Sequence, residues 1–256
     1  MQDQPHNGIL AANNLTKDYG DGRNALDNLT MQVRAGEIYV MLGSNGAGKT
    51  TTINIFLNLI PPTSGEATIC GVATHVDPLK AKSNLAYVSE NVMLYGNLTA
   101  WQNLDFFARL SGKQPTKEEC AAALTRVGLD PSHLNAKVQT FSKGMRQKCG
   151  LAIAIMKGVP AILLDEPTSG LDPRSSNEFQ QLLHNLRKDG CAILMSSHDI
   201  FRSREVADKI GIMSGGKLVV EHDATSLRGM NLEQVYLEVT ANGMSTATAQ
   251  RSGATV

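Results

Sequence analysis

Eight consecutive residues match the G-x-x-x-x-G-K-[ST] spacing of a loop that binds phosphate groups: Gly43, Ser44, Asn45, Gly46, Ala47, Gly48, Lys49 and Thr50. Glycines let the backbone curl around a triphosphate, so that successive N–H groups face its anionic oxygens. Lys49 can reach the β- and γ-phosphates, and the Thr50 hydroxyl can bind Mg²⁺. The alternative is a glycine-rich turn with an unrelated lysine. We favour a phosphate site, because an apolar strand (38–42) precedes the loop and a helix starting at Thr51 is expected to point its positive end at the phosphates.

A second chemical signal is the pair Asp165-Glu166, which ends the apolar strand 161–164. Ligands of open α/β sheets bind at the carboxyl ends of the strands. Asp165 suits a contact to Mg²⁺ through water, because Mg²⁺ gives up its hydration shell reluctantly. Glu166 is then placed to orient or deprotonate a water that attacks the γ-phosphate. Taken alone, the pair could be a solvated strand end, but the upstream loop favours a hydrolytic site.

A third signal lies about twenty residues before Asp165, in the sequence Phe-Ser-Lys-Gly-Met at 141–145. Ser142 can cap a helix that runs to about residue 157. The N–H groups and dipole at the start of such a helix would form a second anion site. An ordinary capped helix is the simpler alternative.

The composition limits the function classes. The chain has 256 residues, with 24 Lys plus Arg and 24 Asp plus Glu, so its net charge is zero and we expect no nucleic-acid partner. Its four cysteines are far apart, which indicates a reduced, cytoplasmic setting and no zinc site. We expect no signal peptide at the polar N-terminus and no membrane span, because no apolar stretch reaches 18 residues.

The expected fold is α/β, with strands at 10–19, 26–33, 38–42, 66–70, 85–88, 161–164, 191–195, 210–213 and 218–220. Capping boxes at Thr99 and Thr116 predict helices over 101–110 and 117–127, and a further helix is expected over 173–187. We therefore divide one nucleotide-binding domain into a core with a β arm (9–90), a helical subdomain (91–158) and the second part of the core (159–240). The tail 241–256, rich in Ser, Thr, Ala and Gly, is predicted to be disordered.

From about residue 10 to 223, these motifs resemble the ATP-binding subunits of ABC transporters, which have a P-loop NTPase core, an antiparallel β arm and a helical subdomain. The resemblance implies an ATPase that uses ATP and Mg²⁺. Residues 141–145 occupy the place of the family's L-S-G-G-Q signature, in which Ser142 and Gly144 are retained and would contact the ATP held by a second subunit. His198 matches the histidine that contacts the γ-phosphate, Tyr19 matches the aromatic that stacks on adenine, and residues 169–172 match the loop that crosses the dimer interface.

One position departs from the family pattern. Glu90 stands where the family has a glutamine that senses Mg²⁺ and couples to the membrane subunit. A glutamate can still approach hydrated Mg²⁺ but adds negative charge beside the phosphates. The coupling role is therefore in doubt here, while hydrolysis is still expected.

The resemblance implies a subunit that forms a homo- or heterodimer on MgATP and drives a separate transmembrane permease subunit, with residues 94–105 as the docking face. It would sit in the cytoplasm on the inner face of the cell membrane, and its end segment 232–237 is similar to that of exporters. One alternative is a soluble ABC-type ATPase in translation or DNA repair; another is an ATPase that helps to mature metalloenzymes. A GTPase or small-molecule kinase is disfavoured, because the guanine-specific N-K-x-D sequence is absent.

Overall fold

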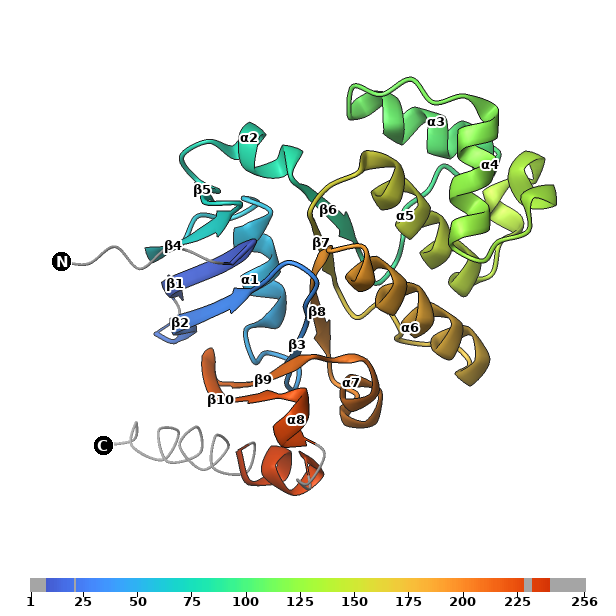
Figure 1. Cartoon of the computed structure of the whole chain (residues 1–256). Coiled ribbons are helices and arrows are strands. Elements are labelled where there is room, and N and C mark those ends of the chain that lie inside the picture. The colour runs from blue at the N-terminus through green and yellow to red at the C-terminus, as the bar shows by residue number, and fades with distance from the viewer. Residues whose placement is uncertain (1–7, 21, 228–231, 240–256) are drawn as a thin grey trace, which may run out of the picture.

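A six-stranded, mostly parallel sheet forms the centre of the computed structural model, which describes residues 8–20, 22–227 and 232–239 (Figure 1). Its strand order is β10-β9-β3-β8-β7-β6. These strands are β3 (Ile38–Leu42), β6 (Leu85–Val88), β7 (Ala161–Leu164), β8 (Ala192–Ser197), β9 (Lys209–Ser214) and β10 (Lys217–Asp223). Only the edge pair β9–β10 is antiparallel. The strands predicted at 210–213 and 218–220 therefore pair as a hairpin.

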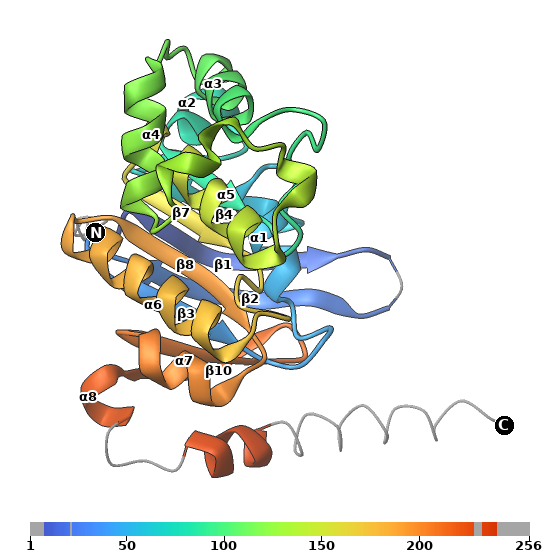
Figure 2. The same cartoon turned by 90° about the vertical axis from the view of Figure 1, so that its right-hand side faces the viewer.

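A second sheet is wholly antiparallel and has the order β2-β1-β4-β5. It consists of β1 (Leu10–Asp18), β2 (Asn24–Val33), β4 (Ser64–Ile69) and β5 (Val72–Ala73). This sheet is the predicted β arm. Together with α1 (Lys49–Phe56), it lies on one side of the central strands, while α5 (Lys143–Lys157) and α6 (Pro173–Lys188) lie on the other (Figures 1 and 2).

The region between β6 and β7 is helical, as expected. It contains α3 (Ala100–Leu110), α4 (Lys117–Arg126), α5 and two short 3₁₀ turns, Pro131–Asn135 and Val138–Thr140. Both predicted capping boxes are confirmed, because Thr99 and Thr116 each accept a hydrogen bond from the third residue of their helix, whose side chain accepts one in return.

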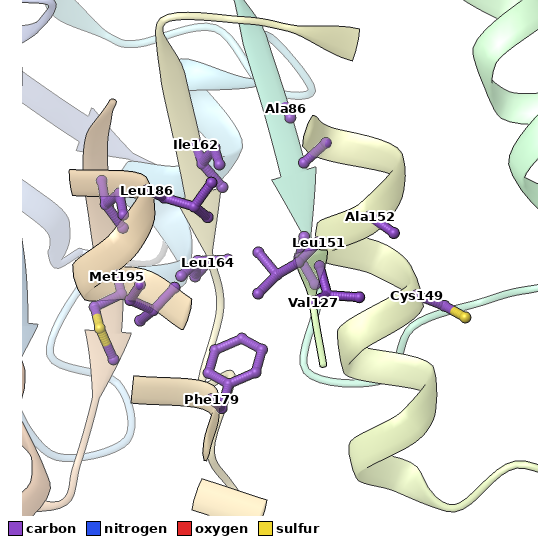
Figure 3. Close-up of a cluster of buried hydrophobic side chains, with 14 of the residues drawn as sticks. Ala86, Val127, Cys149, Leu151, Ala152, Ile162, Leu164, Phe179, Leu186 and Met195 are labelled. Carbon is purple, nitrogen blue, oxygen red and sulfur yellow. The ribbon is translucent and has the colours of Figure 1, made fainter. Parts of the chain in front are cut away.

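The apolar runs of the central strands are explained by burial on both faces. Alternate residues of β3 face opposite sides: Val40 joins the core beneath α5 and α6, whereas Tyr39 joins the core beneath the antiparallel sheet. Figure 3 shows the first of these cores, where Leu151 of α5 and Phe179 of α6 point toward the side chain of Leu164 in β7. The strand ends that carry chemistry are thus fixed by packing from both sides.

Three short helices were not predicted: α2 (Pro78–Ser83), α7 (Ile200–Val206) and α8 (Ala224–Leu227). They have four to seven residues, too few to show a helical period in the sequence. A further helix, 232–239, packs the apolar stripe of Leu232, Val235, Tyr236 and Val239 against the core beneath α5 and α6. The predicted tail 241–256 lies outside the described residues, and the domain boundaries stay predictions. In the described part of the chain, no helix is at once long and apolar enough to cross a membrane.

Candidate functional site

The loops after three neighbouring parallel strands meet at one edge of the central sheet. The glycine-rich loop follows β3, Asp165 and Glu166 follow β7, and His198 follows β8. Since β8 lies between β3 and β7, its loop is flanked by the other two. The carboxyl ends of parallel strands all point to the same edge, so the fold gathers residues that are more than 100 positions apart.

A cavity of about 450 Å³ opens at this edge, within the size range of small-molecule sites. Its wall includes most of the predicted phosphate loop and three acidic residues; the lining residues are Ala25, Ser44, Asn45, Gly46, Ala47, Gly48, Lys49, Thr50, Thr51, Glu90, Asp165 and Glu166. Five other predicted residues, Tyr19, Gly43, Ser142, Gly144 and His198, do not line this cavity.

Two glycines of the loop are required by close contacts. A β-carbon on Gly43 would lie 2.7 Å from the carbonyl oxygen of Met213, and one on Gly48 would lie 2.8 Å from that of Ala25. Gly48 also has a φ of +107°, which residues with a side chain rarely adopt. The loop therefore packs directly against backbone, leaving its inner face for a ligand.

Lys49 is the first residue of α1 and is 6% exposed. Its Nζ donates hydrogen bonds to the carbonyl oxygens of Gly43 (2.6 Å) and Ser44 (3.2 Å) and lies 3.6 Å from Glu166 Oε1. Helix α1 starts at Lys49 without a side-chain cap from any described residue. Its first N–H groups are thus available to an anion, beside a fixed positive charge.

The Asp165 carboxylate and the Glu166 backbone are both held by Ser196, a residue that was not predicted from the sequence as part of the site. Ser196 Oγ donates to Asp165 Oδ1 (2.6 Å) and accepts from the backbone N–H of Glu166 (2.9 Å). Glu166 has a φ of +45°, an uncommon conformation for a residue other than glycine. Such strain is maintained only where the surrounding contacts fix it, as the buried Ser196 does here.

Glu166 bridges two basic groups. Its Oε1 faces Lys49, while its Oε2 lies 2.8 Å from Nδ1 of the half-exposed His198. The predicted residues Lys49, Glu166 and His198 are therefore brought together, although His198 is outside the cavity wall.

The negative charges of Asp165 and Glu166 each raise the pKa of a tyrosine. Burial raises the pKa of Tyr87, and the negative charge of Asp165 raises it further. Burial likewise raises the pKa of Tyr236, with an added contribution from the charge of Glu166. Tyr236 of the helix 232–239 therefore lies within electrostatic range of Glu166, which was not predicted from the sequence.

The second predicted anion site, at the start of α5, has the expected local structure. Ser142 Oγ accepts a hydrogen bond from the Met145 N–H (3.2 Å), which confirms the predicted cap. Gly144 packs against α6, where an added β-carbon would lie 3.4 Å from the Ser175 side chain. This helix start is part of the helical region and does not contribute to the cavity of its own chain.

Tyr19 follows β1 and is 55% exposed. Lys17 Nζ lies 5.1 Å from the centre of its ring, within the range of a cation–π contact. The ring therefore lies open to solvent, outside the cavity wall.

The third acidic residue of the cavity, Glu90, is bound to α5 by two residues that the sequence analysis did not predict as site residues. Lys143 Nζ lies 3.6 Å from Glu90 Oε1. Gln147 Nε2 donates to the carbonyl oxygens of Glu90 (2.7 Å) and Ser89 (3.2 Å). The cavity wall and α5 are thus directly connected.

Comparisons with known proteins agree with these features. The family model for ABC transporters matches residues 26–169. An uncharacterized ABC transporter ATP-binding protein of Bacillus subtilis (strain 168), YcbN, is 38% identical over 236 residues, which cover 91% of this chain and 75% of the relative. The bacitracin transport ATP-binding protein BcrA of Bacillus licheniformis is 38% identical over 232 residues, covering 90% of this chain and 74% of the relative.

Two solved structures are also similar. An ATP-binding subunit of an ABC transporter superposes with a TM-score of 0.79 at 28% identity, covering 90% of this chain and 98% of that one. A dimeric bacterial ABC transporter cassette superposes with a TM-score of 0.75 at 28% identity, covering 84% of this chain and 99% of that one.

Proposed function

The chain belongs to the family of ABC transporter ATP-binding proteins and is an ATPase, and from this premise we propose that two subunits close on two MgATP molecules and drive a separate membrane-spanning subunit. The observation that carries the proposal is the separation of the two anion sites. The cavity contains the phosphate loop and the carboxylates, whereas Ser142 and Gly144 lie outside it on α5. A second subunit would supply the missing half of each site.

The similar cassette described as dimeric supports this arrangement. A triphosphate held by the loop of one subunit would be covered by the start of α5 of the other. The γ-phosphate supplies the charge that this helix start can bind, so ATP favours the closed dimer and its hydrolysis favours opening.

The residues at the sheet edge suit phosphoryl transfer to water. The loop amides and Lys49 stabilise charge on the β- and γ-oxygens. Glu166 accepts a proton from water as the water oxygen bonds to the γ-phosphorus and the bond to the bridging β–γ oxygen breaks. His198 uses Nδ1 to hold Glu166 and leaves Nε2 for the γ-phosphate, and Tyr19 stacks on the adenine.

The oxygen donors in the cavity suit Mg²⁺. Thr50, Asp165 and Glu90 all line the cavity, and their hydroxyl and carboxylate oxygens are the hard ligands that Mg²⁺ prefers. Bound there, Mg²⁺ would neutralise charge on the β- and γ-phosphates. Ser196 keeps the Asp165 carboxylate in place for this contact.

A membrane partner is supported by an apolar groove between β6, α3 and α5. Its volume is about 280 Å³, and its lining includes Tyr87 of β6, Phe107 and Leu110 of α3, and Ile153 of α5. Leu110 is 70% exposed and Tyr87 41% exposed, so apolar surface is available for a docking segment. None of the lining residues falls within 94–105, the predicted docking face; Phe107 and Leu110 follow that segment along α3. The relative named for bacitracin transport makes export the favoured direction.

The dimer is tested with Glu166→Gln, which removes the proton acceptor and leaves the phosphate loop intact. Sedimentation in MgATP should give twice the mass of one chain, with two nucleotides per dimer. Glu166→Gln combined with Lys49→Ala is the matched control and should sediment as a monomer. A Glu166→Gln protein that binds ATP but stays monomeric at saturation would contradict the proposal.

The partner is tested by purifying the tagged chain from membranes solubilised in mild detergent. We expect a multi-span membrane protein to co-purify. Recovery of ribosomes or DNA in its place would instead support a soluble ATPase of translation or repair.

A further inference from the structure

Two residues that depart from the family pattern are in contact with each other. Glu90 stands in place of the family's glutamine, and Lys143 stands in place of the first glycine of its signature. In the structure Lys143 Nζ lies 3.6 Å from Glu90 Oε1. The first substitution adds one negative charge and the second adds one positive charge, so the pair is neutral as a whole.

The surroundings of the pair fix Glu90 at the cavity. Glu90 lines the same wall as Lys49 and Asp165. The buried Gln147 binds the Glu90 carbonyl oxygen and holds the backbone of this turn against α5. Lys143 is the first residue of α5, and its side chain also lies beside Gly170, where an added β-carbon would be 3.4 Å from Nζ. Its ammonium group is thus held between the Glu90 turn and the 169–172 loop.

We propose that Lys143 is a positioning residue that holds the Glu90 carboxylate at the cavity and offsets its negative charge. Without the lysine, a third carboxylate with no paired cation would face the phosphates in addition to Asp165 and Glu166. Like charges in one partly enclosed cavity repel, and the nucleotide would bind more weakly. Lys143 thereby makes the glutamate compatible with nucleotide binding and links the helical region to the cavity.

The exposure of Lys143 and Glu90 limits how much the loss of the lysine can weaken nucleotide binding. The side chains of Lys143 and Glu90 are 30% and 44% exposed, so solvent screens their attraction. For partly exposed pairs we expect loss of the lysine to raise the dissociation constant about twofold to fivefold at low salt. The effect should shrink as added salt shortens the range of the interaction.

A double-mutant cycle tests the proposal. The dissociation constant of a methylanthraniloyl derivative of ATP is measured by fluorescence, with EDTA present so that neither metal nor hydrolysis contributes. Lys143→Gln should weaken binding about twofold to fivefold in the native background and by less than about 1.5-fold in the Glu90→Gln background. Lys143→Arg should restore native affinity, because it keeps the charge.

The matched control is Lys117→Gln. Lys117 is also the first residue of a helix and follows a capping hydroxyl, but it lies in α4, away from the cavity. It should leave the affinity unchanged, which removes net charge and helix fraying as explanations. Thermal unfolding of each variant shows whether the fold is intact.

Equal weakening by Lys143→Gln in both backgrounds would overturn the proposal, as would native affinity in the single variant. The inference rests on the nucleotide site of the proposed function but not on dimerisation, since the affinities belong to separate subunits. A monomeric Glu166→Gln protein would contradict the dimer and leave this coupling measurable.

Discussion

Replacing Ser196 with alanine should impair hydrolysis far more than nucleotide binding. The serine hydroxyl is buried and contacts both residues that follow β7: it donates to Asp165 Oδ1 at 2.6 Å and accepts from the Glu166 N–H at 2.9 Å. Neither contact is to the phosphate loop. The substitution therefore removes one bond to the Asp165 carboxylate and one to the Glu166 backbone, and leaves Lys49 and the loop amides in place.

The two hydrogen bonds of Ser196 set the expected loss of stability. A bond to a charged acceptor contributes about 1.5–3 kcal/mol, and a buried N–H left without a partner costs about 1–3 kcal/mol. Water can enter beside the partly exposed Glu166, so we expect the lower part of the sum, about 2.5–4 kcal/mol, as the fall in the free energy of unfolding. A misplacement of Glu166 by about 1 Å would lower kcat by about 100-fold.

Urea denaturation gives the free energy of unfolding, and phosphate release at saturating MgATP gives kcat. Ser197→Ala is the matched control, because the Ser197 hydroxyl bonds to the backbone of Asp199 and not to the carboxylates. It should keep kcat within about twofold, since no group at the reacting atoms is moved. If Ser196→Ala also hydrolysed ATP at close to the native rate, the assigned role of Ser196 in positioning Glu166 would be refuted.

Three further predictions rest on separate features. Gly48→Ala should abolish ATP binding measured by calorimetry, because its β-carbon would lie 2.8 Å from the Ala25 carbonyl oxygen at a φ of +107°; native affinity would show that the loop can shift. A disulfide reagent should react with one thiol in the folded protein, that of the exposed Cys70, and with four thiols in urea, because burial of the other three cysteines raises their pKa to about 11 or 12. Rapid reaction of two or more thiols in the folded protein would show that these cysteines are not buried. Burial, aided by the charge of Arg187, holds the pKa of His184 below its usual 6.5, so the unfolded chain binds a proton at His184 more readily than the folded chain does. The free energy of unfolding should therefore fall as the pH drops below about 6.5. His184→Gln should make this fall shallower in urea denaturation, and an unchanged dependence on pH would refute the role given to His184.

The elements around the site could be predicted because local signals and packing agree. The strand before the phosphate loop is apolar at every position since both of its faces are buried, and the capping hydroxyls of Thr99 and Thr116 mark their helix starts without any tertiary information. The proximity of the phosphate loop to Asp165 and Glu166 follows from the general rule that ligands bind at the carboxyl ends of parallel strands.

The contacts that could not be predicted depend on the register of paired strands and on how far side chains extend to residues distant in the sequence. Ser196 meets Asp165 because Leu164 pairs with Met195 across β7 and β8, and a shift of one residue would turn its hydroxyl to the other face. Lys143 and Glu90 are 53 positions apart, and no local pattern joins them. The position of Tyr236 near the charge of Glu166 likewise depends on how the helix 232–239 packs.

The most direct test of the composite site uses an ATP analogue with a photoreactive group on its γ-phosphate. Glu166→Gln chains, which hold nucleotide, are mixed with isotopically labelled Lys49→Ala chains, whose own loop cannot hold it, and the mixture is irradiated in Mg²⁺. We expect the photoproduct on residues 141–146 of the labelled Lys49→Ala chain. Photoproduct found only on the chain that holds the nucleotide would contradict this expectation.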